Sequence, residues 1–244
     1  MATASQVHYQ YFTVRSYDVD FQRRLRPDVL CSFFQEVASE HALKLGVGYQ
    51  QLEEQKLFWV LSRLLLQIKE LPKWHEEIKI ETWAKGTDRL FALRDFVVSN
   101  AQGEELVQAT SYWLMLDAQS HRPVRPDHFF TRLKHEQHAI DALIEKLESK
   151  KEKLSHTEIA KYTDLDHNQH VNNIRYVSWI LDSFPLDFFS QHALKSLQIN
   201  FQSELKEGET VEIYKQKTEE QDYLISGYRK GEQQACFNGR LRWE

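Results

Sequence analysis

The stretch AKYTDLDHNQHVNN, at residues 160–173, has a counterpart in RSYDVDFQRRLRP at residues 15–27. Both contain Asp-x-Asp, and each aspartate of the later stretch follows its counterpart by 146 positions, Asp18 matching Asp164 and Asp20 matching Asp166. Each stretch precedes an apolar, helix-like pattern and then several strand-like segments. Internal repetition is a property of the whole chain, so it predicts one structural unit present twice.

Two long helices are predicted, one after each of these stretches. The first begins at Pro27, because proline suits the first helical position, and Gly46 ends it. Between these limits apolar side chains recur every three or four residues, as on one face of a helix. The second begins at Asn172 and Asn173, because an asparagine side chain accepts hydrogen bonds from the free N–H groups of a first turn, and it ends before Pro185.

Strand-like segments follow each helix. They lie at residues 58–68, 76–85, 89–100 and 104–116 in the first half, and at 196–205, 209–220, 222–230 and 233–243 in the second. A helix across an antiparallel sheet leaves sheet edges exposed, and two such halves could cover each other's edge. The sequence therefore predicts an α+β protein with halves at 1–117 and 156–244. The linker at 118–155 is expected to be helical in its charged part, about 136–153.

The composition is that of a globular protein. The chain has 244 residues, of which 41% are hydrophobic, and a formal net charge of −5, which argues against a general nucleic-acid-binding protein. Cys31 and Cys236 form neither a disulfide framework nor a cysteine-rich zinc site. The first residues lack a signal-peptide pattern, and no run of 18 apolar residues would span a membrane. We therefore expect a cytoplasmic protein.

The polar cluster at residues 164–173 admits three interpretations. A calcium loop would need glycine at its sixth position and glutamate at its twelfth, where this chain has Gln169 and Arg175. A zinc site built on His167 and His170 lacks a recognised ligand spacing, so no metal is expected. Turn and cap roles explain the flanking Asp and Asn residues but leave His170 unexplained.

A catalytic interpretation accounts for the remaining residues. Asp166, Asn168 and His170 alternate over five positions, and an extended stretch would point all three to one side. The helix start after them offers N–H donors for a developing oxyanion. In the first half the equivalent positions are Gln22 and Arg24, so only the second half is expected to be catalytic.

The run DLDHNQHVNNIRYVSWIL resembles the acyl-acyl-carrier-protein (acyl-ACP) thioesterase family of plastids and bacteria, and this sequence resembles its bacterial type. The resemblance extends to the segment FTVRSYDVDFQRRLRP, the strand ending WLMLD and the RPVRP linker. It implies a tandem hotdog fold, in which each half is a long helix wrapped by an antiparallel sheet. The activity implied is hydrolysis of fatty acyl-ACP thioesters in fatty acid biosynthesis.

The resemblance also implies the site residues. The family's aspartate, asparagine and histidine fall on Asp166, Asn168 and His170, and its glutamate on Glu204. Where the plant enzymes often have a cysteine after that glutamate, this chain has Leu205, which excludes a nucleophilic cysteine there. Glu204 and His170 are expected to handle protons and Asn168 to orient the carbonyl, while Asp166 either orients the network or attacks directly.

Substrate contacts are expected in the first half. By the resemblance, the acyl chain lies against the strand that carries Trp59, Leu61, Leu64 and Leu66. Because carrier proteins are acidic, docking would use basic side chains, for which the candidates are Arg23, Arg24, Arg26, Arg122, Arg125 and Arg132.

The expected partner is an acyl carrier protein bearing an acyl-phosphopantetheine arm, which belongs to the substrate, so no cofactor is expected. Neither a nucleic-acid partner nor a membrane span is expected. The oligomeric state stays open, with a homodimer as one arrangement. Two alternatives remain: a hotdog thioesterase that acts on acyl-coenzyme A, and a non-catalytic module that binds an acyl carrier.

Overall fold

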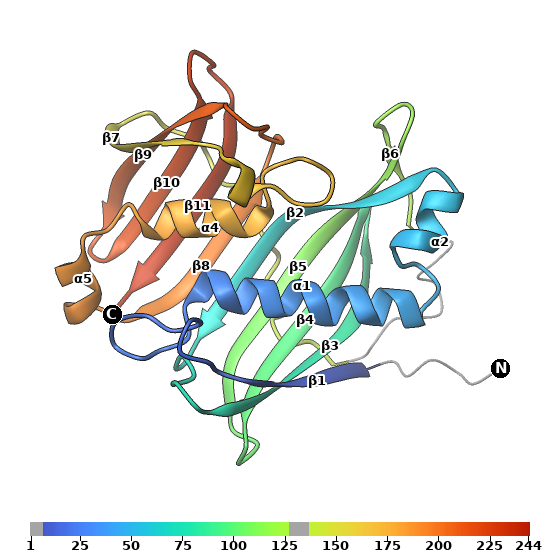
Figure 1. The fold of residues 1–244 in the computed structure, drawn as a ribbon, viewed down its shortest axis with the longest axis horizontal. Helices are drawn as coiled ribbons and strands as arrows, with labels where there is room; N and C mark the ends of the chain where they lie inside the picture. The colour runs from blue at the N-terminus through green and yellow to red at the C-terminus, as the bar shows by residue number, and fades with distance from the viewer. Residues whose placement is uncertain (1–6, 127–136) are drawn as a thin grey trace. The chain divides into compact units, whose positions relative to one another are not determined.

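The computed structural model describes residues 7–126 and 137–244. Backbone contacts divide the chain into two compact units, Met1–Leu143 and Ile144–Glu244. In each unit a helix lies across an antiparallel sheet, α1 with 18 residues in unit 1 and the shorter α4 with 9 residues in unit 2 (Figure 1). No helix in the described part of the chain is both long and apolar enough to cross a membrane.

Unit 1 has the strand order β1-β3-β4-β5-β2, and β6 pairs with β5. Its elements are β1 (Val7–Thr13), α1 (Pro27–Lys44), α2 (Tyr49–Glu54), β2 (Leu57–Ile68), β3 (Glu77–Asp88), β4 (Phe91–Asn100), β5 (Glu105–Asp117) and β6 (Pro123–Val124). The helix and four strands predicted in this half are confirmed to within three residues at each end. Strand β1, helix α2 and strand β6 were not predicted.

Helix α1 begins and ends where the sequence indicates. Pro27 is its first residue, and Gly46 follows the helix with φ 77°, a conformation that glycine adopts without strain. The helix packs on one face of the sheet, where the rings of Phe34 and Phe96 stack with centroids 4.6 Å apart. The layer between helix and sheet is mostly apolar, but it also encloses a polar contact, in which Arg94 Nη1 of β4 lies 2.9 Å from His41 Nδ1 of α1.

A bulge in β2 determines which of its side chains belong to that layer. The pairing of β2 with β5 shifts between Leu61 and Arg63, so one extra residue interrupts the alternation. As a result Trp59, Leu61, Leu64 and Leu66 are opposite Met115, Trp113, Ser111 and Ala109, alternate residues of β5 that share one face. Ala109 in turn pairs with Phe96, so this is the face that α1 covers.

Unit 2 has the strand order β8-β11-β10-β9-β7. Its elements are β7 (Lys153–Ile159), the short 3-10 helix η1 (Tyr162–Asp164), α4 (Asn173–Leu181), α5 (Leu186–Gln191), β8 (Leu194–Phe201), β9 (Thr210–Glu219), β10 (Asp222–Arg229) and β11 (Ala235–Trp243). The predicted cap of α4 is confirmed, because the Asn172 side chain accepts a hydrogen bond from the Ile174 N–H at 3.0 Å.

The expected helix at about 136–153 is wrong. The described residues 137–152 contain no helix, although Ile140, Ile144 and Leu147 are buried at a helix-like spacing. The segment's backbone is bonded to side chains of the sheets instead. In unit 1 the Ala139 N–H donates to Asp95 Oδ2 at 2.8 Å, and in unit 2 the Glu145 carbonyl accepts from Gln198 Nε2 at 2.7 Å. These distant partners replace the hydrogen bonds that a helix would have made.

Candidate active site

The polar cluster of unit 2 forms a tight loop between η1 and α4. Leu165 and Val171 form an antiparallel bridge, and Gln169 takes a φ of 63° at the tip of the loop. The predicted extended stretch, with three side chains alternating to one side, is therefore wrong. The loop turns because the Asp166 N–H donates to the His170 carbonyl at 2.8 Å, which closes the chain on itself.

Asp166 organises this loop from within. Its Oδ1 accepts hydrogen bonds from the N–H groups of Asn168 at 2.8 Å and His170 at 3.3 Å. Asp164, which is buried, accepts from the Lys161 N–H at 2.9 Å and pairs with Arg175 Nε at 2.7 Å. The carboxylates thus fix the backbone on which His170 and Asn168 are carried. The Asn168 side chain is exposed and has no hydrogen-bond partner in the part of the chain that the structure describes.

Glu204 comes from a second loop, directly after β8. The N–H groups of Gln202 and Ser203 donate to the Cys236 carbonyl at 2.8 and 3.1 Å, which ties this loop to β11. The Val171 N–H donates to the Leu205 carbonyl at 2.8 Å and joins the two loops. Across this junction, His170 Nδ1 lies 3.3 Å from Glu204 Oε2.

The histidine and the glutamate are accessible from solvent. The His170 side chain is 29% exposed and that of Glu204 is 53% exposed. An imidazole paired with a carboxylate can accept a proton from water and return it to a leaving group. The arrangement of Asn168, His170 and Glu204 therefore suits hydrolysis of a carbonyl compound. Among the described residues, no cluster of three or more His, Cys, Asp or Glu is placed to hold a metal ion.

The helix start contributes fewer donors than expected. The Ile174 N–H is bonded to the Asn172 side chain, and the Arg175 N–H is bonded to the Asn172 carbonyl at 2.9 Å. These two first-turn donors are satisfied by the cap itself. The expectation that the α4 N-terminus would offer these two N–H groups to an oxyanion is therefore wrong.

Unit 1 contains the same loop with different side chains. Asp20 Oδ1 accepts from the N–H groups of Gln22 at 2.8 Å and Arg24 at 2.9 Å, as Asp166 does with Asn168 and His170. Arg23 has a φ of 62° at the tip. Arg24, at the position of His170, turns back onto Asp20, with its Nε and Nη2 each 3.1 Å from Oδ2. The backbone is repeated, but the reactive groups are absent from it.

The second loop is repeated as well. The Leu25 N–H donates to the Pro72 carbonyl at 2.7 Å, in the same way that Val171 donates to Leu205. This correspondence places Leu71 where unit 2 has Glu204. Unit 1 thus lacks both the imidazole and the carboxylate of the pair, which leaves one candidate site in the described chain.

The residues expected to contact the acyl chain lie together on the α1 side of β2. Leu61, Leu64 and Leu66 are buried, and Trp59 is half-buried with its Nε1 donating to the Val47 carbonyl at 3.0 Å. The bulge in β2 is what brings all four to one face, and the sequence pattern did not reveal it.

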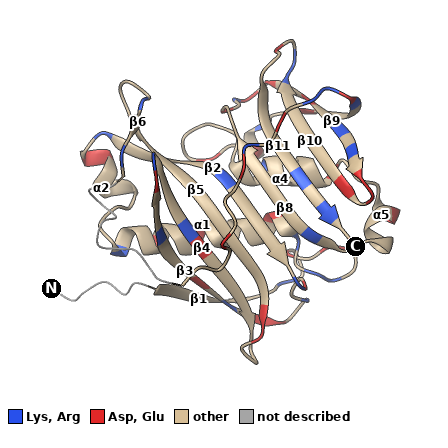
Figure 2. Ribbon diagram, turned by 180° about the vertical axis from the view of Figure 1, so that it is seen from behind, with Lys and Arg blue, Asp and Glu red and all other residues tan. Residues whose placement is uncertain are grey.

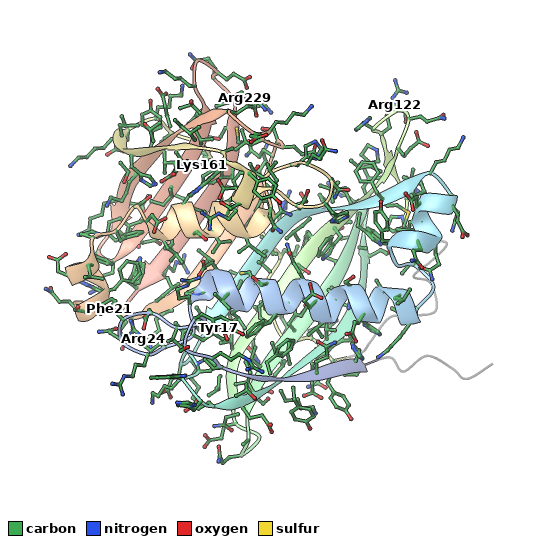
Figure 3. All side chains as sticks on the ribbon, viewed as in Figure 1. Tyr17, Phe21, Arg24, Arg122, Lys161 and Arg229 are labelled. Atoms are coloured by element: carbon green, nitrogen blue, oxygen red, sulfur yellow. The ribbon has the colours of Figure 1, made fainter. Side chains whose placement is uncertain are left out.

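The basic candidates for carrier docking differ in the interactions that their side chains already make. Arg24 is paired with Asp20, and Arg26 Nε lies 3.3 Å from Asp28 Oδ1, so both charges are partly neutralised. Arg23 lies over the Trp74 ring, 5.9 Å from its centroid. Arg122 and Arg125 are exposed and have no ion pair within the described residues; Figure 3 labels Arg122 on the β6 hairpin and Arg24 on the loop before α1. Arg132 lies outside the described residues.

Both thiols are buried. Burial in α1, with a smaller contribution from Asp28, raises the pKa of the Cys31 thiol well above its ordinary value, which disfavours the thiolate. Cys236 lies closer to the site than its sequence position suggested, because its carbonyl holds the Glu204 loop, but its side chain is 1% exposed. Leu205 is fully buried, so the position after Glu204 faces the core.

Sequence reasoning missed Arg229, which ends β10. Its Nη2 donates to the Glu204 carbonyl at 2.9 Å, its Nε lies 2.9 Å from Glu209 Oε1, and its Nη1 lies 2.8 Å from Glu232 Oε1. No local pattern could have identified it, because the residue that it holds is 25 positions away and only the fold brings the two together.

Models of two protein domains match the two halves of the chain. Residues 5–131 match the model of the acyl-ACP thioesterase N-terminal domain, and residues 147–243 match that of the C-terminal domain. A chloroplastic palmitoyl-acyl carrier protein thioesterase of Gossypium hirsutum is 29% identical over 211 residues, which cover 80% of this chain and 51% of that protein. The chloroplastic oleoyl-acyl carrier protein thioesterase 2 of Arabidopsis thaliana is 28% identical, with 82% and 60% covered. The chain thus spans about half the length of the curated relatives it matches.

Solved structures show the same fold over almost the whole chain. An acyl-ACP thioesterase from Bacteroides thetaiotaomicron superposes with a TM-score of 0.90 at 26% identity, covering 98% of each chain. The 12:0-ACP thioesterase of Umbellularia californica has a TM-score of 0.88 at 22% identity, covering 100% of this chain and 99% of that one, and shows likeness of fold alone. The predicted α+β tandem hotdog fold is confirmed. With both halves matched by its domain models, this chain belongs to the acyl-ACP thioesterase family.

Proposed function

We propose that this protein hydrolyses fatty acyl-ACP thioesters and releases a free fatty acid and the carrier's phosphopantetheine thiol. The observation that carries the proposal is the pairing of His170 Nδ1 with Glu204 Oε2 at 3.3 Å, which unit 1 lacks although it repeats the same loops. Membership of the family supports the choice of acyl-ACP over other thioesters.

In this proposal a water molecule attacks the thioester carbonyl. Glu204 and His170 take the proton from the water as its oxygen bonds to the carbonyl carbon, and the Asn168 amide donates to the oxyanion that develops. The carbon–sulfur bond then breaks, and the departing thiolate receives the proton held by the pair. The products are a carboxylic acid and a thiol, so no oxidant, reductant or cofactor is consumed.

Asp166 holds the loop in this scheme and does not attack the carbonyl. Its Oδ1 is bonded to two backbone N–H groups, and Asp20 makes the same two bonds in the half that lacks His170 and Glu204. A role shared by both halves is a property of the loop and not of the chemistry. Two such hydrogen bonds also stabilise the carboxylate and so weaken it as a nucleophile.

The proposal is tested by turnover of matched acyl-carrier and acyl-coenzyme A substrates. We expect a higher kcat/KM on the acyl carrier, and a loss of about 10²–10⁴ in kcat for Glu204→Ala and for His170→Ala. Both variants should stay folded, since neither side chain is buried.

Three results would contradict the proposal. Preference for acyl-coenzyme A would indicate a different hotdog thioesterase. Binding of the acyl carrier without turnover would indicate a non-catalytic module. Near-normal turnover by either variant would reject the roles assigned to Glu204 and His170.

A further inference from the structure

Arg229 contacts the backbone of the candidate base without contacting any place where substrate chemistry is proposed. Its guanidinium donates to the Glu204 carbonyl and is flanked by the carboxylates of Glu209 and Glu232. Two hydrogen bonds, to the Glu204 carbonyl and to Glu232 Oε1, and the ion pair with Glu209 restrain its orientation, because a guanidinium presents its donors in a rigid fork. Figure 3 labels Arg229 in unit 2, where it comes from the end of β10.

Glu209 connects the arginine to the rest of the loop. One of its oxygens, Oε1, pairs with Arg229, while Oε2 accepts a hydrogen bond from the Lys206 N–H at 2.8 Å. The loop from Glu204 to Glu209 is therefore held at both ends, at the Glu204 carbonyl and at Glu209, by the same side chain. The Glu204 carboxylate is half-exposed, so its position depends on the backbone of this loop.

Unit 1 provides an internal control for this arrangement. Its equivalent loop keeps the shared part, because Glu76 accepts from the Lys73 N–H at 2.9 Å as Glu209 does from Lys206. It has Leu71 where unit 2 has Glu204. The arginine is missing too, because Val211 corresponds to Ile78, and Ile78 pairs with Asn100 where Val211 pairs with Arg229.

Asn100 stabilises the turn between β4 and β5 instead, because its side-chain oxygen accepts hydrogen bonds from the Gln102 and Glu104 N–H groups. The loop of unit 1, which has Leu71 in place of the glutamate, thus makes no contact of this kind with an arginine among the described residues. The arginine is present only in the half whose loop carries the glutamate.

We infer that Arg229 is a positioning residue, which holds the Glu204 backbone so that the carboxylate stays at His170. This inference rests on the proposed function and deepens it. A displacement of about 1 Å at a catalytic group can lower turnover by about 10²-fold, so loss of this contact should be measurable in kcat.

The test is a kinetic double-mutant cycle on the full chain with acyl-carrier substrate. Arg229→Gln should lower kcat by about 10- to 10²-fold with little change in KM, because substrate contacts are untouched. In the Glu204→Ala background the same change should have little further effect, since the group that Arg229 positions is already gone. Arg229→Lys should lie between parent and Arg229→Gln, because an ammonium keeps the charge but cannot contact all three acceptors at once.

A second readout does not depend on activity. The NMR resonance of the His170 ring should move in Arg229→Gln in the direction that it moves in Glu204→Ala, since both changes take the carboxylate away from the ring. Arg240→Gln is the matched control. It removes another arginine of unit 2 that is bonded to a carboxylate, in this case Asp222, and it should leave kcat and the His170 resonance unchanged.

Four results would overturn the inference. They are an Arg229→Gln kcat equal to that of the parent, a loss that is additive with Glu204→Ala, a loss shared by Arg240→Gln, and an unmoved His170 resonance. If Arg229→Gln does not fold, Arg229→Lys decides by the same criteria. Failure of the proposed function is seen separately, as absence of turnover by the parent protein.

Discussion

At the scale of single residues, the two halves differ by a few side chains on one backbone. Asp20 and Asp166 make the same pair of hydrogen bonds to the loop that they begin. The side chains later in each loop diverge, because Arg24 returns to its own aspartate while His170 reaches Glu204. The chemistry proposed for unit 2 is thus separable from the loop that supports it. Nucleophilic sulfur plays no part in it.

Replacing both cysteines should leave catalysis intact. We expect Cys31→Ala, Cys236→Ser to hydrolyse acyl-carrier substrate at close to the parent rate, because burial suppresses the Cys31 thiolate and encloses the Cys236 side chain. Steady-state kinetics measure this, with circular dichroism to verify folding. A folded variant without turnover would reopen covalent thiol catalysis.

At the scale of the elements, one buried carboxylate joins the ends of β10 and β11. Asp222 is 4% exposed and receives hydrogen bonds from Arg240 Nη2 at 2.6 Å and Arg242 Nε at 3.1 Å. Burial alone would raise the pKa of Asp222, but the hydrogen bonds and charges of the two arginines outweigh burial and lower that pKa. Figure 2 shows that the strands of unit 2 carry both basic and acidic residues.

The stability of the protein should depend on pH through this aspartate. The pKa of Asp222 is lower in the folded protein than its unfolded value of about 3.9. The contribution of Asp222 to the free energy of unfolding is therefore fully present above about pH 3.9, and it is lost as the pH falls through the folded pKa. At pH 7 we expect Asp222→Asn to lower the free energy of unfolding by about 1–3 kcal/mol. The difference in the free energy of unfolding between the parent and Asp222→Asn should become smaller below about pH 4, as measured by urea unfolding.

A surface aspartate is the control for this pH dependence. Asp187 is exposed on α5, and Asp187→Asn should change the free energy of unfolding by no more than about 0.5 kcal/mol. If Asp222→Asn lowers the free energy of unfolding as much at pH 3 as at pH 7, the stabilisation does not come from the ionised carboxylate.

At the scale of the whole molecule, the net charge has to be reconciled with the acidic carrier protein that we propose as partner. The chain carries a formal net charge of −5, and Figure 2 shows acidic and basic residues interleaved along both units. Attraction to an acidic carrier must then be local. Of the basic candidates, Arg122 and Arg125 are exposed and without an ion pair in the described chain, whereas Arg24 and Arg26 are paired with aspartates.

We therefore expect Arg122→Ala, Arg125→Ala to raise KM for acyl-carrier substrate by about three- to tenfold at low salt. The effect should shrink near 1 M salt, where charges are screened beyond about 3 Å, and should be absent with a small soluble acyl thioester. Arg24→Ala is the control, since its guanidinium is engaged with Asp20. An equal rise in KM for Arg24→Ala, or no rise for the double variant, would place the docking surface elsewhere.

Local patterns were sufficient for much of this fold. Pro27 and Gly46 predicted the limits of α1 and the Asn172 cap predicted the start of α4, because capping and φ preferences act within one turn. Helix α4 ends at Leu181, three residues before the end that Pro185 predicted. Alternation and turn glycines located eight strands. The 146-residue repeat predicted two similar units, and the residue differences between Asp20-Gln22-Arg24 and Asp166-Asn168-His170 pointed to one reactive half.

Other features were decided only by contacts between distant parts of the chain. The charged linker has a helical spacing of apolar residues, yet Asp95 and Gln198 bond its backbone in a non-helical conformation. The bulge in β2 brings Trp59 and Leu66 to one face, which depends on pairing with β5. Glu204 was expected from family resemblance, but its 3.3 Å approach to His170 and its support by Arg229 exist only in the folded chain. Sequence periodicity reports a residue's neighbours along the chain, whereas these contacts are formed by tertiary packing.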